Sequence, residues 1–231
     1  MKKDSFAIAM SAYDEFIELV KDIYRLGAIQ GHLGWDQETI MPVKGAEVRG
    51  EILAWLAKER HSRITDSNLG QLLLKLESES GLDADQAANV REMRRVYDKS
   101  IKLPSEFVSD FAKVRSEALL GWQNARAESD FSAFEPQLQR LVDMTKQKIE
   151  YFGIETTPYD VLLDEYEVGM TVADYDPLFA GLKEKLVPLL QKILQSQKLN
   201  PLPQLPSDLT FSIAAQTEFC EKVSANMGFD F

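Results

Sequence analysis

Apolar residues recur along this chain at steps of three and four positions, and a two-residue alternation is not sustained anywhere. Steps of three and four place side chains on one face of an α-helix, whereas strands alternate every second residue. The pattern therefore predicts an all-α fold of about nine helices, with antiparallel neighbours joined by short loops. The first helix is expected over residues 6–26 and is ended by Gly27 as a C-cap. Its stripe consists of Phe6, Met10, Tyr13, Ile17, Val20 and Tyr24.

Helix-capping residues mark the next two helices. Asp66 stands before a short helix, and Asp83 with Gln86 predicts a capping box at the start of the following one. The basic side chains of that second helix are expected to pair with neighbouring carboxylates, because the chain is acidic overall and no aromatic platform surrounds them. These side chains are Arg91, Arg94 and Arg95, and the leucine stripe after Asp66 is Leu69, Leu72, Leu73 and Leu76.

A long helical hairpin is predicted from residue 104 to residue 153. Pro104 or Ser105 starts its first helix, since proline is favoured in the first turn. Ser132 and Glu135 suggest a capping box for its second helix, and Gly153 ends it. The first helix carries an apolar stripe of Phe107, Phe111, Val114, Ala118 and Trp122.

The C-terminal part contains a helix with an internal Pro188, which predicts a kink because proline removes a hydrogen bond and clashes with the preceding turn. Residues 200–207 hold three prolines and are expected to form an extended connector. A last helix, with Phe219 and Val223 on one face, follows it. We therefore expect residues 1–231 to form one helical region whose last helix is set apart by the 200–207 connector.

The stretch from Gly31 to His61 combines a turn-like segment with an amphipathic helix. Its first part is expected to be a helix–loop–helix corner that ends at Met41-Pro42, with Trp35 in the core and Asp36 as a helix cap. From Gly45 the pattern turns helical. The expected core stripe of that helix is Val48, Ile52, Trp55 and Leu56.

Composition restricts the class of protein. The 231 residues include 37 acidic and 26 basic side chains, a net charge of −11, which disfavours phosphate backbones and anionic membranes. No run approaches the roughly 20 apolar residues of a membrane span, and the N-terminus is not a secretory signal. The single cysteine, Cys220, fits a reducing compartment. The sequence thus predicts a cytoplasmic protein without nucleic-acid or membrane partners.

The usual catalytic signatures are missing from these residues. A zinc peptidase places two histidines one helical turn apart in H-E-x-x-H, but this chain holds only His32 and His61, each isolated, with Cys220 far from both. There is no G-x-S-x-G elbow, Walker loop or dinucleotide fingerprint either. We therefore expect no metal to be bound by this chain.

Three ordered stretches nevertheless resemble one family. The first is Leu33-Gly34-Trp35-Asp36-Gln37-Glu38-Thr39 followed by Met41-Pro42, the second is the hairpin from LPSEF to EPQLQRLV, and the third is PYDVLLDEYEVGMT at residues 158–171. Together they are similar to the N-terminal part of the carboxypeptidase Taq family of zinc metallopeptidases. The resemblance spans nearly the whole chain.

This resemblance implies that the chain is the non-catalytic N-terminal half of an enzyme that removes C-terminal residues from peptides. In such sequences the ending GFDF, at residues 228–231 here, is followed by the H-E-x-x-H helix. Zinc or cobalt would serve the full-length enzyme, and none is expected on this chain, which should be a truncated and inactive form. The family also implies a homodimer, or association through an apolar face left exposed.

By the same resemblance, the N-terminal helices form one wall of a deep cleft. Side chains in or just behind that cleft are then expected among Trp35, Asp36, Gln37, Tyr159 and Asp164. A competing interpretation is that these residues join the first matching stretch to the third, with Asp36 accepting backbone N–H bonds.

The alternative function is a helical protein-interaction module without catalytic activity. Such a module should bury its stripes and remain monomeric, whereas a truncated enzyme should expose a large apolar face.

Overall fold

The structure, a computed structural model, describes residues 10–199, 206 and 208–231. Within those ranges it contains nine α-helices, one short 3-10 helix at Val43–Gly45 and no strand, which confirms the all-α prediction. The expected 200–207 connector lies outside the described residues except for Pro206, and so does Phe6. The helices are α1 Ala12–Thr39, α2 Ala46–Ile64, α3 Ser67–Glu77, α4 Ala84–Ser100, α5 Ser105–Glu128, α6 Phe131–Phe152, α7 Pro158–Leu163, α8 Val172–Leu199 and α9 Ile213–Asn226.

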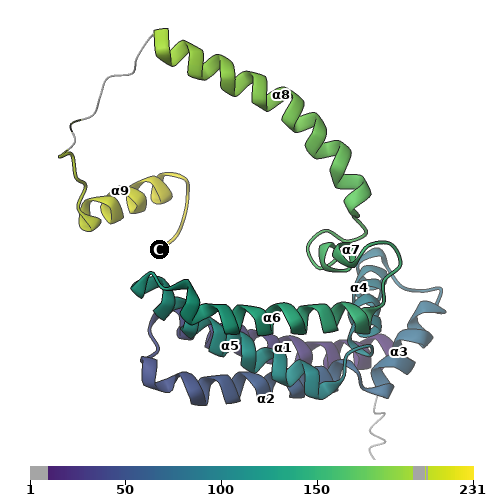
Figure 1. Cartoon of the computed structure of the whole chain (residues 1–231). Helices are drawn as coiled ribbons and strands as arrows, with labels where there is room; N and C mark the ends of the chain where they lie inside the picture. Colours follow the sequence, from purple (N-terminus) through teal and green to yellow (C-terminus); the bar gives the residue numbers. More distant parts are fainter. Residues whose placement is uncertain (1–9, 200–205, 207) are drawn as a thin grey trace, which may run out of the picture. The chain divides into compact units, whose positions relative to one another are not determined.

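The chain divides into two units, one ending at Thr171 and one beginning at Val172. In the first unit α1, α2, α5 and α6 run side by side, while α3, α4 and α7 lie toward one end of this array (Figure 1). Helix α5 packs against both α2 and α6, and α1 packs against α2 and α3. The antiparallel arrangement follows from the short turns between successive helices.

The hydrophobic core of the first unit gathers where α1, α3 and α4 meet the end of α2. Phe16, Leu69 and Leu73 are fully buried there, and all four leucines of the predicted α3 stripe are buried. That stripe is correctly placed because α3 is short, covered on its apolar face and capped by Asp66, which accepts the Asn68 N–H. Burial of such leucines contributes about 1.5–3 kcal/mol each.

Two capping predictions have different outcomes. Asp83 and Gln86 form the expected capping box of α4, with the Gln86 N–H to Asp83 at 2.8 Å. The box expected at Ser132 is wrong, because α6 begins at Phe131, two residues earlier than a Ser132 cap would start it. Asp130 caps it by accepting the Ser132 and Ala133 N–H groups, and the Ser132 hydroxyl also donates to Asp130. A carboxylate next to the exposed N–H groups of a helix start is favoured by the helix dipole.

Helix α1 corrects the expected corner. It does not end at Gly27 but continues through all three of its glycines to Thr39. A Cβ at Gly27 would lie 3.3 Å from the Nε of Arg60, so this glycine allows close approach of α2 instead of ending the helix. The predicted end before Met41-Pro42 is right, since Pro42 starts the following 3-10 helix.

Helix α2 presents the opposite face to the one expected. Val48, Ile52 and Trp55 are exposed, and of the predicted stripe only Leu56 is buried. The buried face consists mainly of small residues, Gly50, Ala54 and Ala57 with His61. A Cβ at Gly50 would be 3.6 Å from the Ser116 hydroxyl of α5, so small residues permit the close α2–α5 contact. The core stripe was predicted from the positions of large apolar residues, so the wrong face of α2 was expected to be buried.

The second unit contains α8 and α9. Helix α8 continues through Pro188, and its ribbon is curved (Figure 1). The described residues of α8 and α9 include no buried side chain, and many apolar residues of α8 are exposed. Among the described residues no helix has the length and hydrophobicity needed to cross a membrane.

Candidate functional site

The first polar cluster lies near the C-terminal end of α1. Asp36 was expected to cap a helix. Instead its carboxylate accepts a hydrogen bond from the guanidinium of Arg49 on α2 and forms an ion pair with it. Arg49 also donates to the backbone oxygen of Leu33, and Gln37 donates to the Ser116 hydroxyl at 2.8 Å. The cluster therefore joins α1 to both α2 and α5.

Trp35 is not a core residue, in contrast to the prediction. Its side chain is 54% exposed, and its ring stacks on His32 with the ring centroids 5.8 Å apart. Asp36 and Gln37, by contrast, contact the neighbouring helices α2 and α5.

We predict that Arg49→Met lowers the free energy of unfolding by about 1.5–3 kcal/mol, the usual range for hydrogen bonds to charged groups. The change leaves Asp36 and the Leu33 oxygen without their donor while keeping an apolar stem. Urea unfolding followed by tryptophan fluorescence measures it. Arg91→Met, at an exposed arginine on α4, is the matched control and should change stability by no more than about 0.5 kcal/mol. Equal losses in the two variants would contradict the structural role of Arg49.

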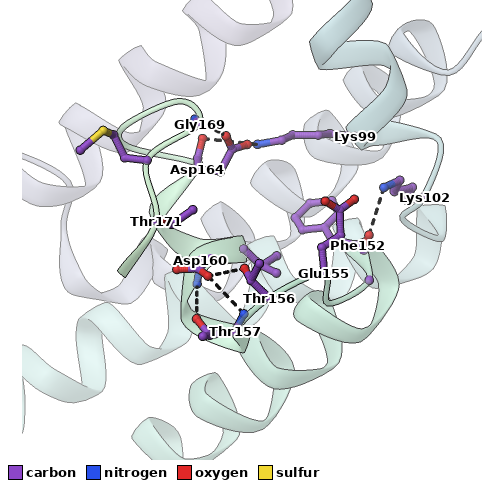
Figure 2. A pocket seen from close by; sticks show the side chains of 13 residues that line it. Lys99, Lys102, Phe152, Glu155, Thr156, Thr157, Asp160, Asp164, Gly169 and Thr171 are labelled. Atoms are coloured by element: carbon purple, nitrogen blue, oxygen red, sulfur yellow. Dashed lines mark hydrogen bonds and ion pairs between the residues drawn. The ribbon is translucent and has the colours of Figure 1, made fainter. Parts of the chain in front are cut away.

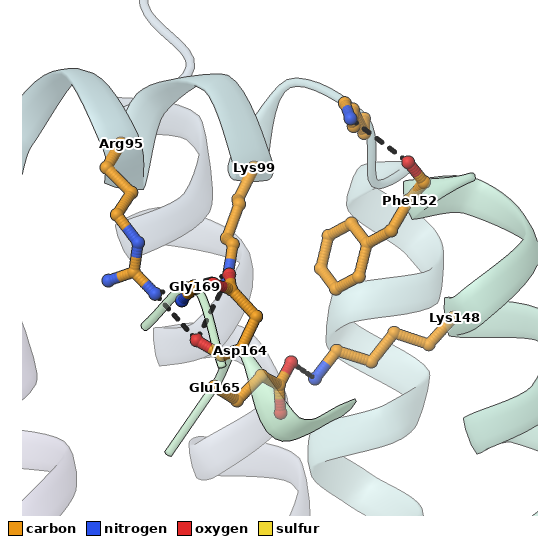
Figure 3. Close-up of polar contacts among 8 residues, drawn as sticks. Arg95, Lys99, Lys148, Phe152, Asp164, Glu165 and Gly169 are labelled. Carbon is orange, nitrogen blue, oxygen red and sulfur yellow. Dashed lines mark hydrogen bonds and ion pairs between the residues drawn. The ribbon is translucent and has the colours of Figure 1, made fainter. Parts of the chain in front are cut away.

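The second cluster surrounds Asp164, immediately after α7, and is shown in Figure 3. Its carboxylate pairs with Lys99 and with Arg95 at 3.3 Å, and it accepts the Gly169 N–H at 2.8 Å. Arg95 also donates to the Asp164 backbone oxygen at 2.7 Å. Partial burial by itself raises the pKa of Asp164, but the bonds from Lys99, Gly169 and Arg95 together outweigh it and lower the pKa to about 2.

Local sequence explains how this cluster forms. Thr157 caps α7 in a capping box with Asp160, and Pro158 occupies its first turn. The helix then ends at Leu163. Gly169 has φ +77°, a left-handed conformation that suits glycine and turns its N–H toward Asp164.

Side chains near Asp164 differ in their exposure. Leu162 and Leu163 are partly buried, but Tyr166 is 84% exposed. Tyr159 is also exposed. Glu165 forms an ion pair with Lys148 of α6, whose ammonium group lies over the ring of Phe152 at 5.6 Å from its centroid (Figure 3). This pair attaches the α7 loop to α6.

A surface hollow of about 390 Å³ lies beside this cluster, bounded by the ends of α4 and α6, by α7 and by the loops on either side of α7 (Figure 2). We call it the α7 hollow. It is lined among others by Lys99, Lys102, Phe152, Glu155, Asp160 and Asp164.

The five residues singled out from the sequence fall into two separate groups. Trp35, Asp36 and Gln37 belong to the end of α1 near the turn into α2, whereas Tyr159 and Asp164 belong to the α7 region at the other end of the array (Figure 1). The interpretation that they join the first matching stretch to the third is therefore wrong, since each group contacts other helices. A role in a substrate cleft stays a prediction.

The sequence identified only some of the cations that pair with carboxylates in these clusters. The pairing of the α4 arginines with carboxylates is confirmed for Arg94, which binds Glu77 through two hydrogen bonds, and for Arg95. Lys99 and Lys148 were not identified. The spacing of Arg95 and Lys99, four residues apart on one helix face, was the available signal for a site that binds one carboxylate.

A metal site cannot be assembled from the donors described. Within the described ranges no group of three or more His, Cys, Asp or Glu side chains could hold a metal ion. His61 is buried with its Nε2 3.0 Å from the Ser100 oxygen, and His32 stacks on Trp35. The two histidines thus serve packing and hydrogen bonding, and the residues present do not fit the open coordination that a catalytic metal needs.

Comparison with known proteins accounts for this fold. A profile of the family described as carboxypeptidase Taq (M32) metallopeptidase matches residues 15–231. The chain belongs to this family. This M32 chain is 34% identical over 232 residues to thermostable carboxypeptidase 1 of Thermus thermophilus. The match covers 95% of this chain and 45% of that protein. Carboxypeptidase 1 of Bacillus subtilis is 33% identical over 183 residues, which are 79% of this chain and 36% of that protein.

Solved M32 structures agree with the sequence relationship. The crystal structure of BsuCP matches with a TM-score of 0.86 at 29% identity, covering 96% of this chain and 44% of that one. Metallocarboxypeptidase 1 of Trypanosoma cruzi matches with a TM-score of 0.78 at 31% identity, covering 95% and 44%. The predicted family is confirmed, and the chain spans less than half the length of the relatives that it matches.

Proposed function

We propose that this chain is the N-terminal, non-catalytic region of a metal-dependent carboxypeptidase that removes C-terminal residues from peptides in the cytoplasm. The observation that carries the proposal is family membership together with a donor set that lacks H-E-x-x-H. Zinc or cobalt would be held by polypeptide beyond these 231 residues. The helices described here would supply the scaffold and one wall of the cleft.

Within this proposal the two polar clusters have different tasks. The Asp36–Arg49 cluster fixes the end of α1 against α2, and Trp35 is available at the surface to border a cleft. Asp164 fixes the loop between α7 and Thr171. Gln37 and Tyr159 are further candidates for contact with the substrate.

The exposed apolar side chains of α8 support the proposal that further polypeptide covers this helix in the whole enzyme. Leu178, Phe179 and Leu186 of α8 are each more than half exposed, which is unusual for a helix of a self-contained domain. Either polypeptide from the rest of the enzyme or a second copy would cover them. A helical protein-interaction module remains the second candidate, because the same residues could bind a different protein.

We predict that the purified chain does not hydrolyse peptides when supplied with zinc or cobalt, and that it binds a hydrophobic dye strongly. Peptide hydrolysis is measured by release of the C-terminal amino acid, and bound metal by elemental analysis. Adding the H-E-x-x-H half of an M32 relative as a separate polypeptide should suppress dye binding and generate activity. Hydrolysis with stoichiometric metal on the chain alone would contradict the proposal, and a monomer without dye binding would favour the interaction module.

A further inference from the structure

The α7 hollow contains an unusual combination of charges. Lys99 and Asp164 lining it neutralise each other in an ion pair. Lys102, by contrast, bonds to the backbone oxygen of Phe152 at 3.0 Å and has no carboxylate partner among the residues described. Glu155 forms no ion pair with the described part of the chain either. Among the described residues, this cation and this anion at the hollow thus have no ion-pair partner.

The donor and acceptor capacity of these two groups is only partly used. An ammonium group has three N–H donors, so Lys102 keeps two after its bond to Phe152. A carboxylate offers about four lone-pair sites, and Glu155 is an exposed residue. Figure 2 shows Lys102 and Glu155 on the same side of the hollow, both beside Phe152. A ligand that satisfies both groups must carry a negative and a positive charge close together.

Part of the remaining wall of the hollow is apolar. Phe152, Val161 and Met170 line it, and their side chains provide a surface that water solvates poorly. Hydrophobic walls with a few placed polar groups are typical of small-molecule sites. An inorganic anion would satisfy Lys102 but would be repelled by Glu155 and Asp160 and leave the apolar wall uncovered.

We propose that the α7 hollow binds a free α-amino acid with an apolar side chain. The ligand's carboxylate would accept hydrogen bonds from Lys102, and its ammonium group would donate to Glu155. Its side chain would lie against Phe152, Val161 and Met170. The ammonium and carboxylate groups of an α-amino acid are both attached to one carbon, which suits Lys102 and Glu155 because both lie beside the ring of Phe152. This inference rests on the lining of the hollow and is independent of the proposed peptidase function.

Titration of the ¹⁵N-labelled full chain with L-phenylalanine tests the proposal. Saturable shifts are expected for backbone amides of the hollow, such as Gly153, Thr156 and Gly169, with a dissociation constant in the millimolar range for so small a ligand. Phenylalaninamide, which lacks the carboxylate, and N-acetylphenylalanine, which lacks the ammonium group, should each bind about ten-fold more weakly.

Variants identify the groups responsible. Lys102→Met and Glu155→Gln should each weaken L-phenylalanine binding about five- to ten-fold, whereas Lys75→Met, at an exposed lysine of α3, should leave it unchanged. Unaltered amide signals outside the hollow show that each variant is folded. The proposal is overturned by absence of saturable shifts, by binding of either blocked derivative as tightly as L-phenylalanine, or by unchanged affinity in both hollow variants.

Discussion

Leu73→Ala is expected to lower the free energy of unfolding by about 2–5 kcal/mol, the usual cost of removing three buried carbon atoms from a core. Leu73 is fully buried in the cluster where α1, α3 and α4 meet, which also includes Phe16 and Val90. The cavity left behind cannot collapse easily, because three helices hold its walls. Urea unfolding, monitored by tryptophan fluorescence, provides the measurement.

The neighbouring residue offers a matched control. Leu74 is the same residue type at the next position of α3, but it is 64% exposed. Leu74→Ala should therefore change stability by no more than about 0.5 kcal/mol. Comparable losses in the two variants would show that α3 does not present the described face to the core.

The second large effect is expected at Asp164. Asp164→Asn removes the negative charge that pairs with both Arg95 and Lys99, while the side chain keeps its shape. Both cations then lack a carboxylate partner at this position. A shift of the pKa from 3.8 to about 2 corresponds to about 2.5 kcal/mol of stability near neutral pH. We expect the variant to lose about 1–3 kcal/mol at pH 7, because the amide can still accept the Gly169 N–H.

The same shift predicts how the effect depends on pH. Since the folded-state pKa lies below the unfolded value of 3.8, the stabilisation is complete well above pH 3.8 and is lost as the pH falls toward about 2. The difference between wild type and Asp164→Asn should therefore narrow between pH 7 and about pH 3. Glu167→Gln, an exposed carboxylate of the same loop, is the control and should show a small difference at every pH. A pH-independent loss at Asp164 would mean that shape, and not charge, matters there.

The parts of the fold that the sequence predicted are those where one helix face decides burial. The α3 leucines and the Asp83–Gln86 capping box depend on residues within one helix, so local pattern was sufficient. The predicted buried face of α2 was wrong because the helix packs against α5 through small residues, and α5 lies about 60 residues away in sequence. Gly27 misled the prediction for a similar reason, because it allows a close contact with α2 instead of ending α1.

The candidate site was predictable only in part. The family stretches contain Asp36 and Asp164, and both carboxylates form ion pairs with cations from other helices. Their partners Arg49 and Lys99 carried no motif, because an ion pair between helices has no fixed sequence spacing. The α7 hollow could not be anticipated either, since Lys102, Glu155 and Met170 come from three separate segments.

The uneven distribution of tryptophan has a practical consequence for all of these unfolding measurements. Trp35, Trp55 and Trp122 belong to α1, α2 and α5, so intrinsic fluorescence records the loss of the first unit alone. Circular dichroism adds the long α8 helix, whose described side chains bury nothing and which must melt without a core of its own. The two signals should therefore give different midpoints, and their separation is a direct readout of how far folding cooperativity extends along the chain.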